Sequence, residues 1–310
     1  MDYLASNEWA RESPYNRFFD FIAPDADRYQ ILIELLENLK LNSAVIPING
    51  SRHFFIFPPK YSLKDSSGLK FPFRGMSPVI LVAHYDRAEG SQGANDNSAA
   101  VFQMLKAALK LQEQEADYWI IIFTDKEELK PGESVKEQGS FGLAEKLKVL
   151  GLQDARVFIF DACGTGDTFV ISSTTDILLR YDDRPGIWRT KQQVTELRGQ
   201  ALDTARFLRL DRILSVPTPF SDDAGFLRAG LPAQTITMLP TKEASPYAMF
   251  LRQKPQFADF LIAGAIKSGP DRLRIPETWR CLNGPSDSYL RLTPEFFDRV
   301  IRFAVGLCKM

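Results

Sequence analysis

Three short, fully apolar runs constrain the fold of this chain more than any other feature. They are PVILVA (78–83), YWIIIF (118–123) and RVFIF (156–160), and helical patterns such as NSAAVFQMLKAALKLQ lie between them. Strands that are buried on both faces and alternate with helices are typical of a parallel sheet between two helical layers. The sequence therefore predicts an α/β protein, a three-layer αβα domain with a mixed, mostly parallel central sheet.

Further elements are predicted around these runs. Apolar residues at helical spacing over 29–41 indicate an amphipathic helix. Residues 43–59 alternate and contain Asn-Gly, which predicts an edge hairpin. A fourth strand is predicted at 232–238, and a last helix over 293–309 with Thr293 as its N-cap.

Length and composition favour a single globular domain. At 310 residues the chain is long enough for one large α/β domain or two small ones. No repeat or Gly/Ser-rich linker divides it, so we predict one domain over 28–310 after an N-terminal extension over 1–27. The formal net charge is −1 with both signs interspersed, which argues against nucleic acid and anionic membranes as partners.

The same composition suggests a compartment. The first residues, MDYLASNEWARESPYNRFF, are polar and lack the apolar core of a secretory signal. The longest apolar runs are the size of strands, too short to span a membrane. Three scattered cysteines are too few for a disulfide framework. We therefore expect a cytoplasmic protein.

Polar residues follow each of the three apolar runs. His84 and Asp86 follow the first, 125–128 (DKEE) the second, and Asp161 the third. Ligands of open α/β sheets bind at the carboxyl ends of the strands. Each residue alone has an ordinary explanation, such as a structural histidine or carboxylates at a helix start. Together, several carboxylates on one sheet edge repel one another unless a cation neutralises them, and zinc accepts imidazole and carboxylate ligands.

The order of these motifs resembles a known family. AHYD, GANDNSAA, FTDKEE with Gly-Ser further on, a strand ending in Asp, and SDDAGFLRAGLPA occur in the order of the co-catalytic zinc aminopeptidases, whose relatives include carboxypeptidases and glutaminyl cyclases. The resemblance spans residues 28–308. It implies a fold of the zinc-exopeptidase (phosphorylase/hydrolase-like) type and a metallopeptidase that binds zinc.

The resemblance also implies a role for each matching residue. The ligands of the first metal would be His84, Asp96 and Asp161. Asp96 would bridge to a second metal, and Asp86 would orient the imidazole. Glu127 would act as the general base toward a metal-activated water, and Glu128 would bind the second metal.

The second metal position departs from the family pattern. Relatives close it with a histidine in a pattern near His-Thr-x-x-Asp, whereas this chain reads NGPSD and has Asn283 in that place. An amide oxygen is a weak zinc ligand and suits harder ions. Three interpretations stay open: Asn283 is a weak ligand, for zinc or for manganese or cobalt; the second metal is absent; or a neighbour substitutes for the histidine, namely Cys281, Asp222, Asp223 or Asp287. Cys281 and Asn283 would face the same way on an extended chain.

These observations lead to one functional expectation and two alternatives. We expect a metal-dependent exopeptidase that removes the N-terminal residue of a peptide or an amino-acid amide, with one or two zinc ions. The replacement at Asn283 instead suits a catalytically degenerate relative that acts as a binding protein. A glutaminyl cyclase-like acyltransferase is the third possibility, although the resemblance places the metal of that branch at the altered second position.

Overall fold

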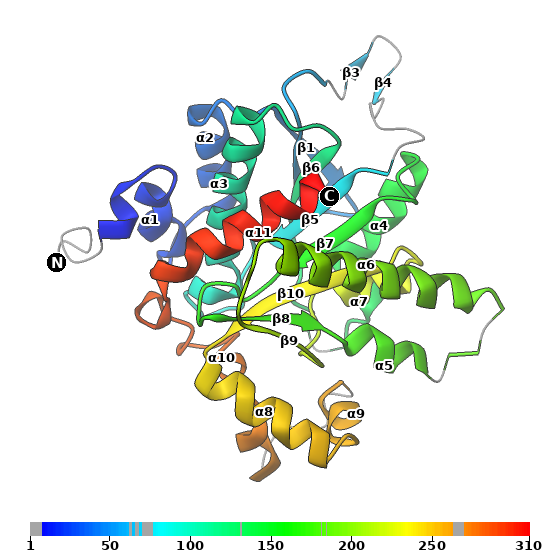
Figure 1. Ribbon diagram of the computed structural model, residues 1–310. Helices are drawn as coiled ribbons and strands as arrows, with labels where there is room; N and C mark the ends of the chain where they lie inside the picture. Colours follow the sequence, from blue (N-terminus) through cyan, green and yellow to red (C-terminus); the bar gives the residue numbers. More distant parts are fainter. Residues whose placement is uncertain are drawn as a thin grey trace.

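An eight-stranded sheet forms the centre of the molecule (Figure 1). The computed structural model describes residues 8–61, 64–65, 68–69, 77–130, 132–180, 182–183, 185–262 and 270–310. The strands of this sheet are β1 (Ser43–Ile48), β2 (Ser51–Ile56), β5 (Val79–His84), β6 (Trp119–Thr124), β7 (Arg156–Phe160), β8 (Thr168–Ser172), β9 (Ile213–Val216) and β10 (Ala233–Leu239). A separate two-stranded ribbon consists of β3 (Lys64–Asp65) and β4 (Gly68–Leu69).

The strand order is β1-β2-β6-β5-β7-β10-β8-β9. The four central strands, β6, β5, β7 and β10, are mutually parallel. The hairpin of β1 and β2 adds antiparallel to β6, and β8 adds antiparallel to β10 with β9 parallel beside it. The predicted mixed, mostly parallel sheet is therefore confirmed, and the predicted hairpin lies at its edge.

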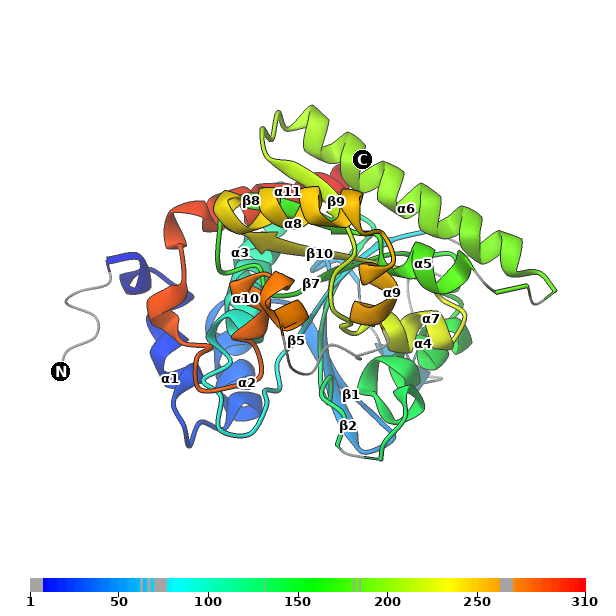
Figure 2. The ribbon, with the colours of Figure 1, turned by 90° about the horizontal axis from the view of Figure 1, so that it is seen from below.

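Helices cover both faces of the sheet. They are α1 (Phe18–Ile22), α2 (Arg28–Asn38), α3 (Ala99–Glu113), α4 (Gly139–Val149), α5 (Thr174–Arg180), α6 (Ile187–Phe207), α7 (Asp223–Arg228), α8 (Thr241–Gln253), α9 (Phe257–Ile262), α10 (Glu277–Arg280) and α11 (Phe297–Lys309). Figure 2 shows α1, α2 and α3 on one side of the sheet, and α4 and α7 on the other. Within the described part of the chain, no helix is both long enough and apolar enough to cross a membrane.

The alternation along β5 explains the three layers. Val79, Leu81 and Ala83 belong to the core shared with α2, α3 and α11. Ile80 and Val82 point the other way, into the core shared with α4 and α7. Because both faces are apolar, the strand must be covered on both sides. The predicted αβα architecture is confirmed.

The N-terminal residues pack against this domain. From residue 8 onward the chain forms two 3₁₀ turns, η1 (Glu8–Arg11) and η2 (Tyr15–Arg17), and then α1. Phe18 and Phe21 of α1 are fully buried in the core that contains α3 and α11. Residues 1–7 of the expected extension lie outside the described residues, and the domain boundary at residue 28 stays a prediction.

Two strands of the central sheet and one helix cap differ from the sequence prediction. β8 and β9 were not predicted, because TFVIS and ILSV are short and contain hydroxyl residues. Thr293 precedes a 3₁₀ turn, η7 (Pro294–Phe296), but its side chain caps no helix. Its hydroxyl accepts the backbone N–H of Gly166 at 2.7 Å instead, and α11 begins only at Phe297. The predicted N-cap role of Thr293 is therefore wrong.

Candidate metal centre

The carboxyl ends of β5, β6 and β7 bring the predicted site residues to one edge of the sheet. His84 is the last residue of β5 and lies in register with Thr124 at the end of β6. Asp161 follows β7 directly. Since the three strands are parallel neighbours, side chains at their ends converge.

Asp96 comes from the loop before α3, and two flanking amides hold it near Asp161. Asn97 donates its side-chain N–H to the carbonyl of Phe160 at 2.8 Å. The side-chain oxygen of Asn95 accepts the backbone N–H of Gly164 at 2.7 Å. Both partners lie on the stretch of chain that contains the end of β7. The Asn-Asp-Asn pattern therefore fastens the Asp96 loop to the chain that carries the other carboxylate.

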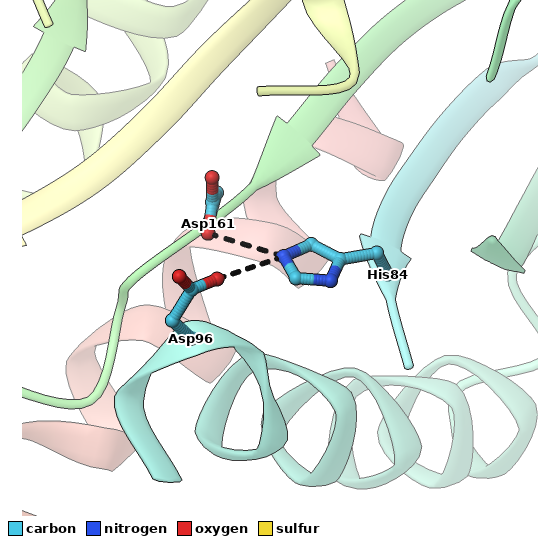
Figure 3. Close-up of side chains that lie close together, drawn as sticks. All are labelled: His84, Asp96 and Asp161. Atoms are coloured by element: carbon cyan, nitrogen blue, oxygen red, sulfur yellow. Dashed lines mark ion pairs between the residues drawn. The ribbon is translucent and has the colours of Figure 1, made fainter. Parts of the chain in front are cut away.

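Three side chains converge on one point between them, as Figure 3 shows. Nε2 of His84 lies 3.0 Å from Oδ1 of Asp96 and 3.6 Å from Oδ1 of Asp161. One ligand atom from each residue lies within 4.8 Å of the others. Among the described residues, Nε2 of His84 and Oδ1 of Asp161 are buried without a hydrogen-bond partner. One imidazole and two carboxylates aimed at a common point fit a zinc ion.

Asp86 connects the imidazole to the loop after β6. Its Oδ1 lies 3.4 Å from Nδ1 of His84, and its Oδ2 accepts the backbone N–H of Glu127 at 3.0 Å. Burial would raise the pKa of Asp86, but the contact with His84 and the backbone N–H groups of Glu127 and Glu128 outweigh it and lower that pKa. Asp86 therefore stays ionised, as a residue that orients an imidazole ligand should.

The carboxylates at the centre repel one another unless a cation lies between them. Burial alone would lower the pKa of His84, but the carboxylates of Asp161, Asp86 and Asp96 raise it well above its usual value. Burial, followed by the charge of Asp161, raises the pKa of Asp96. Both pKa values are raised because negative charge is crowded at the centre. A bound cation would supply the positive charge that keeps the carboxylates ionised.

Glu127 lines the same small cavity as Asp96 and Asp161. The volume of this cavity is about 120 Å³. Its backbone is held at both ends, because its N–H reaches Asp86 and its carbonyl accepts the side-chain N–H of Gln138 at 2.9 Å. Burial, and then the charges of Asp96 and Asp161, raise the pKa of Glu127 well above its usual value. The larger apolar residues that line the cavity are Pro219, Phe220, Trp279 and Leu282.

The two residues predicted for a second metal are more exposed than the three converging side chains. Glu128 is exposed and is not among the side chains that converge. Asn283 is exposed as well and contributes to the cavity wall. The expectation that Cys281 and Asn283 face the same way is wrong, because residues 281–283 form a turn after α10 and Asn283 has a φ of +59°.

Asp287, a candidate substitute ligand, binds the backbone of the Asp96 loop. Its Oδ1 accepts the backbone N–H of Asn95 at 2.8 Å, and its Oδ2 accepts that of Asp96 at 3.1 Å. Burial, and then the charge of Asp96, raise the pKa of Asp287 to about 6. Both of its oxygens are therefore engaged with backbone, which leaves Asp287 a role in shaping the loop.

Two further candidate substitutes, Asp222 and Asp223, are buried at the start of α7. Asp222 accepts the hydroxyl of Thr124 at 2.6 Å, and burial raises its pKa to about 6. Asp223 accepts the backbone N–H of Ser221 at 3.0 Å, and burial raises its pKa to about 7. Neither belongs to the group of converging ligand atoms within the described residues.

Sequence reasoning missed two residues that hold this centre from a distance and misjudged the role of a third. Arg28 and Gln138 act on the backbone of the site, and no local pattern marks them, whereas Asp287 was expected as a substitute ligand and binds the backbone of the Asp96 loop instead. The second histidine, His53, is buried on β2, where its Nδ1 accepts the backbone N–H of Asp125 at 3.4 Å. It lies outside the converging group.

Comparison with solved structures places the fold. A zinc-dependent exopeptidase from Parabacteroides distasonis covers 100% of this chain and 99% of its own at 13% identity, with a TM-score of 0.59. A Porphyromonas gingivalis glutaminyl cyclase matches over 95% and 94% of the two chains at 15% identity, with a TM-score of 0.59. The Legionella pneumophila aminopeptidase LapA matches over 100% and 72% at 12% identity, with a TM-score of 0.58. The chain spans only 48% of the length of a zinc aminopeptidase from Bacillus subtilis that it also resembles.

Comparison of the sequence with known protein families identifies the family of this chain. No curated protein sequence matches the chain. The family model described as "Peptidase family M28" matches residues 72–257, which include His84, Asp96, Glu127 and Asp161 and exclude Arg28 and the C-terminal part that carries Asn283. With more than half of its residues matched, this chain belongs to peptidase family M28.

Proposed function

We propose that the protein is a metal-dependent exopeptidase that removes the N-terminal residue from a peptide or an amino-acid amide. Membership of peptidase family M28 supports the reaction class. The observation that carries the proposal is the convergence of His84, Asp96 and Asp161 on one point that shares a cavity with Glu127.

His84, Asp96 and Asp161 would hold the metal. When bound there, a zinc ion would polarise the scissile carbonyl and lower the pKa of a coordinated water. We expect one tightly bound ion per chain, because Glu128 is exposed and does not join the converging group among the described residues, and Asn283 offers only an amide oxygen, which is a weak zinc ligand. Manganese or cobalt remains an option for a weaker second position, since an amide oxygen suits harder ions than imidazole does.

Glu127 would move the proton. Its carboxylate would accept a proton from the attacking water and deliver it to the amine of the leaving peptide. A carboxyl whose pKa is raised well above its usual value suits both steps. Asp86 would keep Nε2 of His84 directed at the metal by holding Nδ1, and its bond to the N–H of Glu127 would fix the base relative to the ligand.

The size of the cavity supports cleavage at a chain end. Its volume of about 120 Å³ is well below the ~300–1,000 Å³ that encloses a drug-sized ligand. One terminal residue fits such a space, whereas an extended peptide does not. The substrate would therefore enter with its N-terminal side chain against Phe220 and Trp279.

The test compares metal-free and zinc-loaded protein on aminoacyl amides, short peptides and peptides with N-terminal glutamine. Glu127→Gln should abolish turnover and retain zinc, while Glu113→Gln, the same change at the exposed end of α3, should leave both unchanged. Cyclisation of N-terminal glutamine without hydrolysis would identify a cyclase. Zinc binding with no turnover of any substrate would identify a binding protein and overturn the proposal.

A further inference from the structure

Arg28, the first residue of α2, is buried, with only 7% of its surface exposed. Its guanidinium lies over the ring of Phe21 at 4.7 Å. It donates to six oxygens: the backbone carbonyls of Phe21 (3.2 Å), Tyr85 (3.0 Å), Asp86 (3.1 Å), Gln92 (2.7 Å) and Gly93 (3.5 Å), and the hydroxyl of Ser98 (2.9 Å). A buried arginine normally pairs with a carboxylate, so this use of the side chain calls for an explanation.

Five of the six contacts join two segments that carry the converging ligands. One nitrogen binds residues 85–86, which directly follow His84 at the end of β5. Another binds residues 92–98, the loop that presents Asp96. A guanidinium holds both at once because its donors form a planar, rigid fork, which an ammonium group lacks. This one side chain therefore links the chain after His84 to the loop that presents Asp96.

The charge of Arg28 also suits the site. Burial, and then the nearby Arg87, lower the pKa of Arg28 to about 9, so the group remains protonated at neutral pH. Asp86, Asp287 and Asp96 attract the charge electrostatically. Every acceptor named above is a neutral oxygen, so the positive charge is not consumed by an ion pair within the described residues. It remains available to offset the repulsion among the carboxylates of the centre.

We propose that Arg28 is a positioning residue that sets the distance between His84 and Asp96 and thereby the affinity of the centre for metal. The inference rests on the proposed function only in requiring that these residues bind a metal ion. The packing at Gly93 agrees with it, because a Cβ at that position would lie 2.9 Å from Nη2 of Arg28 and 2.8 Å from the carbonyl oxygen of Asp96. The loop is thus built in direct contact with the guanidinium.

The experiment measures zinc affinity by competition with a chromophoric chelator, and the visible spectrum of the cobalt-substituted protein. Arg28→Lys keeps the charge and removes the fork, and should weaken zinc binding by about 10- to 100-fold, the range found for groups that orient metal ligands. Ser98→Ala removes one contact on the Asp96 side and should act in the same direction with a smaller effect. The cobalt spectrum of both variants should shift, because the ligands are displaced.

Arg87→Lys is the matched control. Arg87 lies on the same loop as Asp86 and also donates to backbone carbonyls, but mainly those of residues 22–24, with one long contact of 3.5 Å to Gln92. The zinc affinity and the cobalt spectrum of the Arg87→Lys variant should match those of the parent protein. Thermal melting of the metal-free variants separates a change in folding stability from a change in the site.

Each outcome decides the matter. A parent protein that binds no zinc removes the proposed function itself. If the parent protein and the Arg28→Lys variant bind zinc equally well, the proposed role of Arg28 is refuted and the proposed function is unaffected. Equal losses in Arg28→Lys and Arg87→Lys also refute that role, because they indicate a general loosening. If Arg28→Lys does not fold, Ser98→Ala with an unshifted spectrum and unchanged affinity is the refuting result.

Discussion

Asp223 is a buried carboxyl whose ionisation should destabilise the metal-free protein at neutral pH. Only 2% of its surface is exposed, and burial, with the charges of Asp161 and Asp222, raises its pKa from 3.8 to about 7. Between these values the folded protein binds more protons than the unfolded chain, so the free energy of unfolding falls as pH rises from about 4 to about 7. At ~1.4 kcal/mol per pH unit, the whole effect is about 4 kcal/mol.

Asp223→Asn removes the charge and keeps an oxygen that can accept the N–H of Ser221. We expect the variant to match the parent at about pH 4 and to exceed its stability by up to about 4 kcal/mol at about pH 8. Urea unfolding of chelator-treated protein at both pH values measures the difference, with the exposed Asp154→Asn as control. An advantage of equal size at both pH values would assign the effect to packing. No advantage at pH 8 would refute the raised pKa.

Three other predictions concern the metal and the substrate. Asp86→Asn should lower zinc affinity about 10- to 100-fold by releasing the imidazole, as measured by chelator competition; unchanged affinity would mean that the 3.4 Å contact does not orient His84. Asn283→His should raise the zinc content from one ion per chain to two in elemental analysis, whereas an unchanged count would show that more than the imidazole is missing. Trp279 packs edge-on against Tyr247 at 5.4 Å and borders the cavity, so Trp279→Ala should shift kcat/KM toward larger N-terminal residues. The same order of substrates in both proteins would exclude Trp279 from the pocket wall.

The sequence predicted the layers and the central strands because their signals are local. Runs such as PVILVA are apolar on both faces, and β5, β6, β7 and β10 appear where these runs lie. β9 escaped prediction because an edge strand is half exposed and its four residues carry no periodic pattern. The grouping of His84 with Asp161 followed from the parallel strand order, since both stand at strand ends.

The supports of the site could not be read in the same way. The contacts of Arg28 with the site segments span 57 to 70 positions, and Asp287 contacts residues 191 and 192 positions away. Most of these contacts are with backbone groups, which every residue type possesses, so no partner signature exists in the sequence. Asp287 was considered only as a substitute ligand, because a carboxylate near Asn283 suggests coordination before it suggests loop support.

The contact between Asp287 and the Asp96 loop has a consequence for the order of events during synthesis. The Asp287 carboxylate is translated long after the N–H groups of Asn95 and Asp96 that it binds. While the ribosome is still adding the intervening residues, the loop lacks the support that aligns Asp96 with His84. We therefore expect the nascent chain to acquire its metal only after this late segment has emerged, and a chain truncated before Asp287 to retain no zinc on a desalting column.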